Sequence, residues 1–219
     1  MKKGIFNLIR KNSLLVLYSL VVTIFLWGCG GGGPGSPGSS GTEDTGVIID
    51  ATVVPNYLGK DTYSVDVVRQ NCGTADSPDW EPFTDHGATL TINARLVNPN
   101  TTFRVGTLYV ERYTVEFRRS NDSVGAPPIE SDTRYHTIVI TPPTGNGVST
   151  VETTVILVDL KRKEKYLNDM LSGQYTSGMA FINNYTATYT FYGKNEFGTG
   201  FSFKATTNFQ IGSFDNCGG

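Results

Sequence analysis

The sequence predicts an all-β protein, an antiparallel β-sandwich with one short helix. Strand-forming Thr, Tyr, Phe and Val are plentiful, with 11 Tyr and 12 Phe among 219 residues. Apolar and polar residues alternate along several segments, as in strands that bury one face. Proline and glycine turns separate these segments and no helix is repeated, so two packed sheets are the expected architecture.

The first segments after residue 46 are predicted to be short strands. Residues 47–54 are rich in β-branched side chains and are expected to stop at Pro55. A second strand is expected over residues 63–70, with Tyr63, Val65 and Val67 on one face. After a polar loop over residues 71–87, residues 88–96 alternate between apolar and polar side chains, which predicts a half-buried strand.

The next strand carries a change of face. Leu108 and Val110 occupy even positions, whereas Tyr113 and Val115 occupy odd ones. Successive residues of a strand point to opposite faces, so apolar residues can change parity only where an extra residue is inserted. The pattern therefore predicts a bulge or bend near Glu111–Arg112.

One helix is predicted, and it follows two further strands. The strands cover residues 136–141 and 150–160, and the helix covers residues 161–171 and stops at Gly173. Its apolar side is expected to hold Leu160, Leu167 and Leu171. The basic run over residues 161–165 is interpreted as a solvated helix face, with a patch for an acidic partner or lipid head group as the alternative.

The last hairpin is the clearest structural signal. Residues 185–192 and 201–211 alternate, and each presents one aromatic face that must pack on another sheet. The segment around Tyr185-x-Ala187-x-Tyr189 resembles the last two strands of immunoglobulin or fibronectin type III modules. The resemblance implies an immunoglobulin-like sandwich, although the chain lacks the cysteine pair and core tryptophan spacing of immunoglobulin domains.

The N-terminus has the pattern of a secretory signal. Residues 1–13 carry four bases and no acid, and residues 14–27 carry no charge. This apolar run is short for a membrane span, which needs about 20 residues. Leu26-Trp27-Gly28-Cys29 resembles the lipobox of bacterial lipoproteins, in which a leucine precedes two mostly small residues and a cysteine; bulky Trp27 departs from it. An uncleaved signal-anchor helix is the alternative.

The lipobox resemblance implies a domain order and a location. Residues 1–28 would be removed as a signal peptide, and Cys29 would carry acyl chains that hold the protein on a membrane. Residues 29–46 form a Gly/Ser/Pro tether and residues 47–219 the β-sandwich. Gly30 stands where an aspartate tends to retain lipoproteins in the inner membrane, so the expected location is the outer membrane of a diderm bacterium.

The mature chain is acidic. Removing residues 1–28 leaves 14 bases against 20 acids, a formal charge of −6. This charge repels phosphates, so neither nucleic acid nor an anionic lipid surface is an expected partner.

The remaining cysteines, Cys72 and Cys217, allow one pairing. Disulfides persist in compartments outside the cytoplasm, so a Cys72–Cys217 bridge is expected, with two free thiols as the alternative. Such a bridge would fix the last strand beside the loop after the second strand.

Catalytic motifs are missing from the sequence. His86 and His136 are the only histidines, there is no G-x-S-x-G elbow, and no His/Cys cluster has zinc spacing. No enzyme activity and no cofactor are therefore expected. His136, which opens a strand, is interpreted as an ordinary surface or edge residue.

One polar loop combines acids and aromatics. Such a loop could hold calcium or contact a partner or sugar; the other interpretation is a solvated acidic loop beside Cys72. The candidate residues are Asp76, Asp79, Trp80, Glu81, Asp85 and His86.

These observations support two main functional hypotheses. The first is a non-catalytic envelope lipoprotein that binds or braces another envelope protein. The second is a cell-surface ligand-binding or adhesion module that uses the Asp76–His86 loop, with calcium as a possible ligand. An enzyme is the third and least favoured hypothesis.

Overall fold

The computed structural model describes residues 42–175, 182–214 and 217. The lipobox at Leu26–Cys29 and most of the tether lie outside the described residues. No helix in the described part of the chain is long and apolar enough to cross a membrane.

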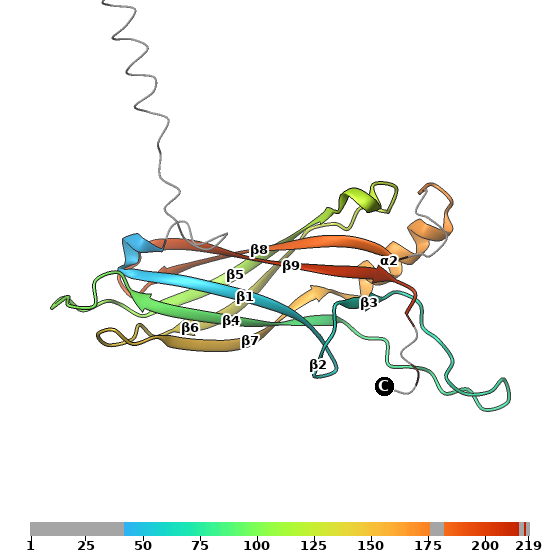
Figure 1. Ribbon diagram of the computed structural model, residues 1–219, viewed down its shortest axis with the longest axis horizontal. Helices are drawn as coiled ribbons and strands as arrows, with labels where there is room; N and C mark the ends of the chain where they lie inside the picture. The colour runs from blue at the N-terminus through green and yellow to red at the C-terminus, as the bar shows by residue number, and fades with distance from the viewer. Residues whose placement is uncertain (1–41, 176–181, 215–216, 218–219) are drawn as a thin grey trace, which may run out of the picture. The chain divides into compact units, whose positions relative to one another are not determined.

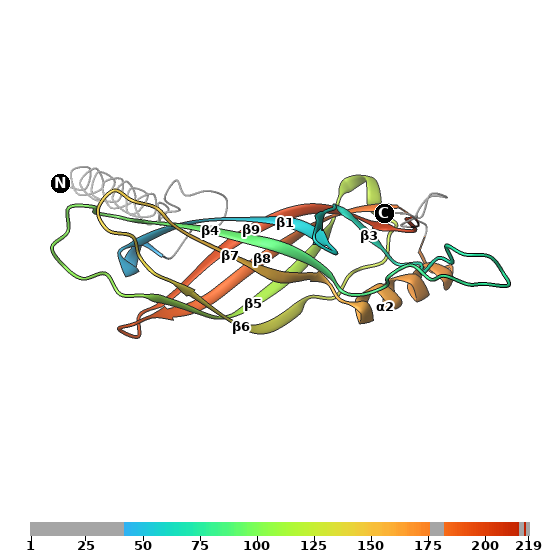
Figure 2. The same ribbon diagram turned by 90° about the horizontal axis from the view of Figure 1, so that it is seen from below.

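Two β-sheets and one short α-helix make up the fold (Figures 1 and 2). Sheet A has the order β2-β1-β4-β7, and sheet B has the order β3-β9-β8-β5-β6. The strands of sheet A are β1 (Val47–Tyr57), β2 (Lys60–Asp61), β4 (His86–Leu96) and β7 (Ser149–Val158). Those of sheet B are β3 (Ser64–Asp66), β5 (Leu108–Arg119), β6 (Asp132–Ile140), β8 (Asn183–Asn195) and β9 (Gly200–Gly212). The predicted β-sandwich with one short helix is confirmed.

The core lies between the sheets and follows the predicted alternation. In β4 the residues that face sheet B are completely buried, while the residues between them are partly exposed. The long hairpin β8–β9 presents its aromatic face inward, as expected. Each large apolar side chain buried in this way contributes about 1.5–3 kcal/mol relative to an exposed one. The central buried residues are Ile49, Leu90, Ile92, Tyr113, Tyr185, Tyr189, Phe191 and Phe203.

The predicted bulge in β5 is confirmed. The pairing of β5 shifts between Val110 and Arg112 against both neighbouring strands, β6 and β8. Val110 and Tyr113 are both buried, and Glu111 and Arg112 between them are both exposed. The extra residue thus keeps both halves of the strand in the core.

The expected end of the first strand was wrong. β1 does not stop at Pro55 but continues to Tyr57, with Pro55 opposite Ala88 of β4. The Pro55 carbonyl accepts a hydrogen bond from Thr62 N, so this residue presents its backbone groups away from β4, where the missing N–H removes no bond of the β1–β4 ladder.

The second predicted strand is shorter than expected and differs in direction. It forms only β3, which pairs in parallel with β9, so sheet B is mixed. Val65 and Val67 are buried, but Tyr63 is exposed, contrary to the prediction.

The end of the predicted tether belongs to the fold. Thr42 is buried, residues Glu43–Thr45 form the 3₁₀ helix η1, and Gly46 adopts a left-handed conformation with φ 81°. The Gly46 carbonyl accepts a hydrogen bond from Val97 N. The folded domain thus begins about five residues before the predicted boundary.

The predicted helix is α2 (Leu160–Leu171), and its predicted apolar side is only partly correct. The Asp159 side chain caps its N-terminus by accepting a hydrogen bond from Arg162 N, and Gly173 follows with φ 72°. Lys163, Tyr166 and Met170 are buried, whereas Leu171 is 70 % exposed. Of the three leucines, Leu167 packs against the core and Leu160 is half-buried.

Two tyrosine hydroxyls connect the sheets at one backbone position. Ile156 lies in β7, an edge strand of sheet A, and its N–H donates to the Tyr113 hydroxyl at 3.0 Å. Its carbonyl accepts from the Tyr189 hydroxyl at 3.1 Å. Edge strands carry backbone groups without a strand partner, so sheet B supplies partners for both groups of this residue.

We expect Tyr113→Phe and Tyr189→Phe each to lower the free energy of unfolding by about 1–2 kcal/mol, because each leaves a backbone group of Ile156 without its partner. Urea unfolding followed by circular dichroism measures the loss. Tyr192→Phe is the matched control, since Tyr192 lies on the outer face of the same sheet. A loss in the control equal to that in the core variants would contradict this role of Ile156.

Candidate functional site

The predicted Asp76–His86 loop is divided into two parts by the fold. Its first part projects from the end of the sandwich that carries α2 (Figure 1) and is closed by a bridge between Asn71 and Trp80. Asp76 and Asp79 are exposed there. The Arg69 guanidinium lies 5.4 Å from the centre of the half-exposed Trp80 ring.

A disulfide ties this projection to the C-terminal end of the chain. Cys72 and Cys217 are bonded, with their Cα atoms 5.2 Å apart, and the predicted pairing is confirmed. Cys72 N also donates to the Asp79 carbonyl at 2.6 Å. The bridge links the loop after β3 to the segment after β9, across 145 residues of sequence.

The second part of the loop turns inward. Glu81 and His86 are only 2 % and 1 % exposed, and Glu81 accepts a hydrogen bond from Gln70 N. Asp85 accepts one from Leu160 N, at the start of α2. The fold therefore divides the six candidate residues into two sets. Asp76, Asp79 and Trp80 are exposed on the projection, whereas Glu81, Asp85 and His86 come together near Lys163 beneath α2.

The geometry does not favour the calcium hypothesis. Among the described residues, the only cluster of His, Cys, Asp and Glu ligand atoms is formed by Cys72, Glu81 and Cys217. Its two sulfurs are bonded to each other and do not act as thiolate ligands. In the described part of the chain, Asp76, Asp79 and Asp85 belong to no group of this kind.

A buried cluster of ionisable groups lies beneath α2 instead. Its centre is Lys163, which is 1 % exposed and whose Nζ lies 5.0 Å from the ring centres of both Tyr57 and Phe83. Burial lowers the pKa of Lys163 to about 8, and the nearby carboxyls of Asp66, Asp85 and Glu81 partly oppose this decrease. The middle of the basic run is thus a core residue and not part of a solvated face.

His86 is a neutral structural residue. Its ring stacks on Tyr57 with centroids 5.2 Å apart, and its Nε2 lies 3.1 Å from the Thr62 carbonyl, to which it donates. Burial lowers the pKa of His86 to about 4. A ring that is enclosed and bonded in this way does not act as a general base for a solvent-borne substrate.

Asp66 carries the opposite shift. Its Oδ1 accepts hydrogen bonds from Val68 N and Phe214 N, at 3.1 and 3.0 Å. Burial raises the pKa of Asp66 to about 6, and a hydrogen bond with the Glu81 carboxyl adds to this increase. Asp66 therefore links the two segments of the chain that precede Cys72 and Cys217.

The other bases of the run are divided between ion pairs and solvent. Arg162 pairs with Asp159 at 2.7 Å and Asp132 at 3.3 Å, and Arg134 pairs with the same two acids. This four-membered network fastens the start of α2 to the start of β6. Lys165 pairs with Asp169 on the helix surface.

We expect Asp66→Asn to raise the melting temperature at pH 7.5. A carboxyl whose pKa rises from 3.8 to about 6 on folding makes its ionised form less favourable in the folded state by at most about 3 kcal/mol. Asparagine keeps the acceptor oxygen and adds a donor toward Glu81. The advantage should shrink as the pH falls through 6 toward 3.8, because the wild-type carboxyl then becomes neutral.

His86 has a separate effect: its lowered pKa makes the protein lose stability as the pH falls from 6.5 toward 4. The wild type and Asp66→Asn both contain His86, so the difference between their melting temperatures reports on Asp66. Exposed Asp79→Asn serves as the control for replacing a carboxyl by an amide outside the buried cluster. A lower melting temperature of Asp66→Asn at pH 7.5 would mean that the charge pairing of Asp66 with Lys163 dominates.

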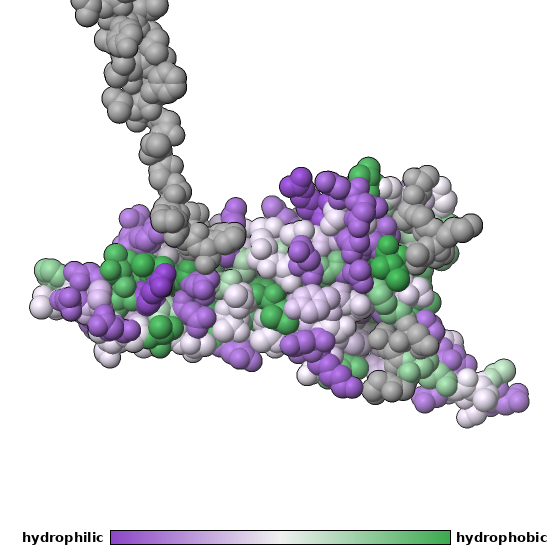
Figure 3. All heavy atoms as spheres, viewed as in Figure 1, coloured by the Kyte–Doolittle hydropathy of each residue, from purple (hydrophilic) through white to green (hydrophobic). Residues whose placement is uncertain are grey.

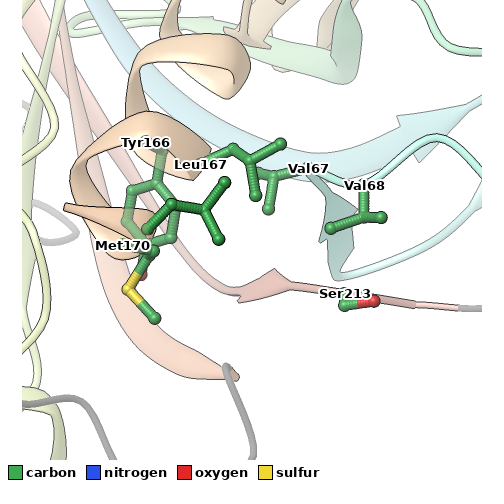
Figure 4. Close-up of a pocket in the computed structure, with 7 residues that line it drawn as sticks. Val67, Val68, Tyr166, Leu167, Met170 and Ser213 are labelled. Carbon is green, nitrogen blue, oxygen red and sulfur yellow. The ribbon is translucent and has the colours of Figure 1, made fainter. Parts of the chain in front are cut away.

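A shallow apolar groove lies beside the buried cluster. Its volume is about 190 Å³, and Figure 4 shows Tyr166, Leu167 and Met170 of α2 on one side and Val67 and Val68 on the other. No hydroxyl–imidazole pair opens into it. The described residues contain one such pair elsewhere, His136 Nε2 and Thr153 Oγ1 at 3.3 Å between the edge strands β6 and β7, as expected for an edge histidine.

The outer face of sheet B carries a second candidate surface, which we call the tyrosine face and define as Tyr109, Arg112, Tyr135 and Tyr192. Tyr135 is 82 % exposed, and Arg112 lies between it and Tyr192 in the strand register. The Arg112 guanidinium lies 5.0 Å from the centre of the Tyr192 ring. Lys194 lies opposite Tyr109 in the neighbouring row.

Sequence reasoning missed the tyrosine face, although its signal was present. The predicted bulge places Tyr109 and Arg112 on the outer side of β5, and Tyr192 is an outward residue of the predicted hairpin. The row becomes visible only when Arg112 is known to pair with Tyr135 and Tyr192.

Comparison with known proteins adds no functional information. No protein-family model, curated protein or solved structure matches the chain.

Proposed function

We propose that this chain is a lipid-anchored module of a bacterial cell envelope that binds another envelope protein and catalyses no reaction. Acyl chains on Cys29 hold it to a membrane outside the cytoplasm, with the outer membrane as the favoured site. The tyrosine face is its binding surface. The observation that carries the binding role is the row of exposed Tyr and Arg side chains across β6, β5 and β8.

The disulfide supports a location outside the cytoplasm. Cysteine pairs remain oxidised in secretory and envelope compartments and are usually reduced in the cytosol. The Cys72–Cys217 bridge therefore fits a chain that is exported by the leader before Cys29. The leader, the lipobox-like motif and the bridge independently favour the same compartment.

The buried groups support a role without catalysis. His86, Asp66 and Lys163 lie in the core and are committed to contacts within the fold. A general base or a nucleophile needs access to a substrate. These groups instead hold the disulfide-linked segment and α2 on the sandwich.

The tyrosine face has the chemistry of a protein-binding surface. Tyr and Arg are enriched among residues that dominate the energy of protein interfaces, because they combine large contact areas with polar ends. Arg112 and Lys194 place positive charge on this face of an acidic domain, so the favoured partner presents carboxylates beside apolar side chains.

The lipid anchor is tested by Cys29→Ser in the full chain. We expect the wild-type protein to carry an acylated N-terminal cysteine by mass spectrometry and to float with membranes in a sucrose gradient. The variant should lack the acyl mass and leave the membrane fraction. A wild-type chain that still contains residues 1–28 and no acyl group would contradict the lipoprotein hypothesis.

The binding surface is tested with a photo-reactive phenylalanine analogue placed at Tyr135 or, as a control, at Tyr63. Both tyrosines are exposed, but Tyr63 lies outside the tyrosine face. We expect irradiation of cells to cross-link one specific protein through position 135 and not through position 63. Arg112→Glu should remove that product by reversing the charge beside it. Equal products at both positions, or an Arg112→Glu variant that cross-links normally, would overturn the assignment.

A further inference from the structure

We infer that the end of the sandwich opposite α2 rests on the lipid bilayer and inserts apolar loop residues into it. This loop end consists of the loops over residues 97–107 and 141–148 and the β8–β9 turn over residues 196–199. The inference rests on the proposed lipid anchor and adds a second, non-covalent contact with the same membrane.

The strand register places these loops and the start of the folded domain at one end. Val47, the first residue of β1, lies opposite Leu96, and Leu108 lies opposite both Ile140 and Asn195. η1 precedes Val47 directly. Figures 1 and 2 show η1, the two loops and the β8–β9 turn together at the left of the view, and α2 at the right.

Each of the three loop segments exposes a large apolar side chain. Phe103 is 84 % exposed, Phe197 and Val148 are each 62 % exposed, and Val97 is 47 % exposed. Figure 3 shows apolar residues among hydrophilic ones at the surface of this end. Apolar side chains that protrude from neighbouring loops are typical of protein or membrane contact sites.

The loop end does not depend on charge for binding. Arg104, next to Phe103, pairs with Glu196, next to Phe197, at 2.7 Å. Glu196 also accepts a hydrogen bond from Thr107 N, which holds the two segments together. The mature chain is acidic and is not attracted to anionic lipids. The insertion of apolar side chains therefore supplies the favourable free energy of membrane binding.

The short chain between Cys29 and the folded domain favours the membrane as the binding partner of the loop end. Cys29 and Thr42 are 13 positions apart, and Gly-rich chains of that length have a typical r.m.s. span of about 20 Å. The far end of β1 lies 11 residues further along an extended strand, about 35 Å away. The exposed Leu58 and Leu171 at that end are therefore much farther from the acyl chains than Phe103 is.

A weak intrinsic affinity is sufficient under these conditions. A short flexible linker produces an effective concentration in the millimolar range, so a patch with a dissociation constant of the same order spends a large part of its time bound. A few exposed phenylalanine and valine side chains supply that much, although they would not hold an untethered domain on a membrane.

The test uses the full chain, purified in its acylated form and reconstituted into phosphatidylcholine vesicles that contain brominated acyl chains. Single reporter variants Phe103→Trp, Phe197→Trp and Tyr135→Trp are compared with the unsubstituted protein, whose Trp80 supplies the background. Bromine quenches tryptophan at short range. We expect emission of the tryptophans at 103 and 197 to fall about twofold or more and that at 135 to remain unchanged.

A loss-of-contact variant completes the experiment. Phe103→Asp with Phe197→Asp should still float with the vesicles through Cys29, while a Val148→Trp reporter in it should lose its quenching. Floating protein with no quenching at 103 and 197, or with equal quenching at 135, overturns the bilayer contact and leaves the anchor intact. Protein that neither floats nor carries acyl chains overturns both the proposed anchor and this inference.

Discussion

The aromatic layer between the sheets is the interaction on which the rest of the fold depends. Phe201, Phe203, Phe191 and Tyr189 follow one another across β9 and β8 with ring centroids 4.8–6.3 Å apart. Tyr113 joins this layer from β5 at 5.6 Å from Phe191, and it can do so only because the bulge changes the parity of that strand. From this position the hydroxyls of Tyr113 and Tyr189 reach the edge strand β7. The one residue inserted at the bulge thus places the Tyr113 ring in the core and its hydroxyl beside the edge strand β7. The same residue also directs Arg112 to the outer face of sheet B.

The end that carries α2 is organised by a different constraint, the burial of charge. Lys163 enters the core between two aromatic rings, and this position is tolerable because Asp66, Asp85 and Glu81 lie near it. The attraction between Lys163 and these carboxyls draws together the segments that supply them. The disulfide, the Asp66 hydrogen bonds and the Asp85 contact with α2 all act on these segments. These contacts hold α2 and the disulfide-linked segment on the sandwich.

The features that follow from the alternation of apolar and polar residues along a strand were predictable from the sequence. The features that depend on contacts between residues far apart in the sequence were not. The alternation of residues 88–96, the last hairpin and the bulge follow from the positions of apolar residues alone. The helix was predicted, but its buried side was not, because Lys163 is buried through contacts with Tyr57 and Phe83, which are distant in sequence. For the same reason the Asp76–His86 loop looked like one acidic cluster, although Asp76 and Asp79 are exposed and Glu81, Asp85 and His86 lie near buried Lys163.

The proposed membrane contact of the loop end restricts where a partner can bind the tyrosine face. Tyr109 and Arg112 lie within the first five residues of β5, whose first residue Leu108 adjoins the loop end. At about 3.4 Å per residue, the tyrosine face begins within roughly 15 Å of those loops. If the loop end contacts lipid, this face stands close above the bilayer and is oriented sideways, because it is the outer surface of sheet B. A soluble protein would have to approach the membrane surface to reach it. The proposed membrane contact and the proposed binding surface therefore favour a partner that is itself anchored in, or attached to, the same membrane.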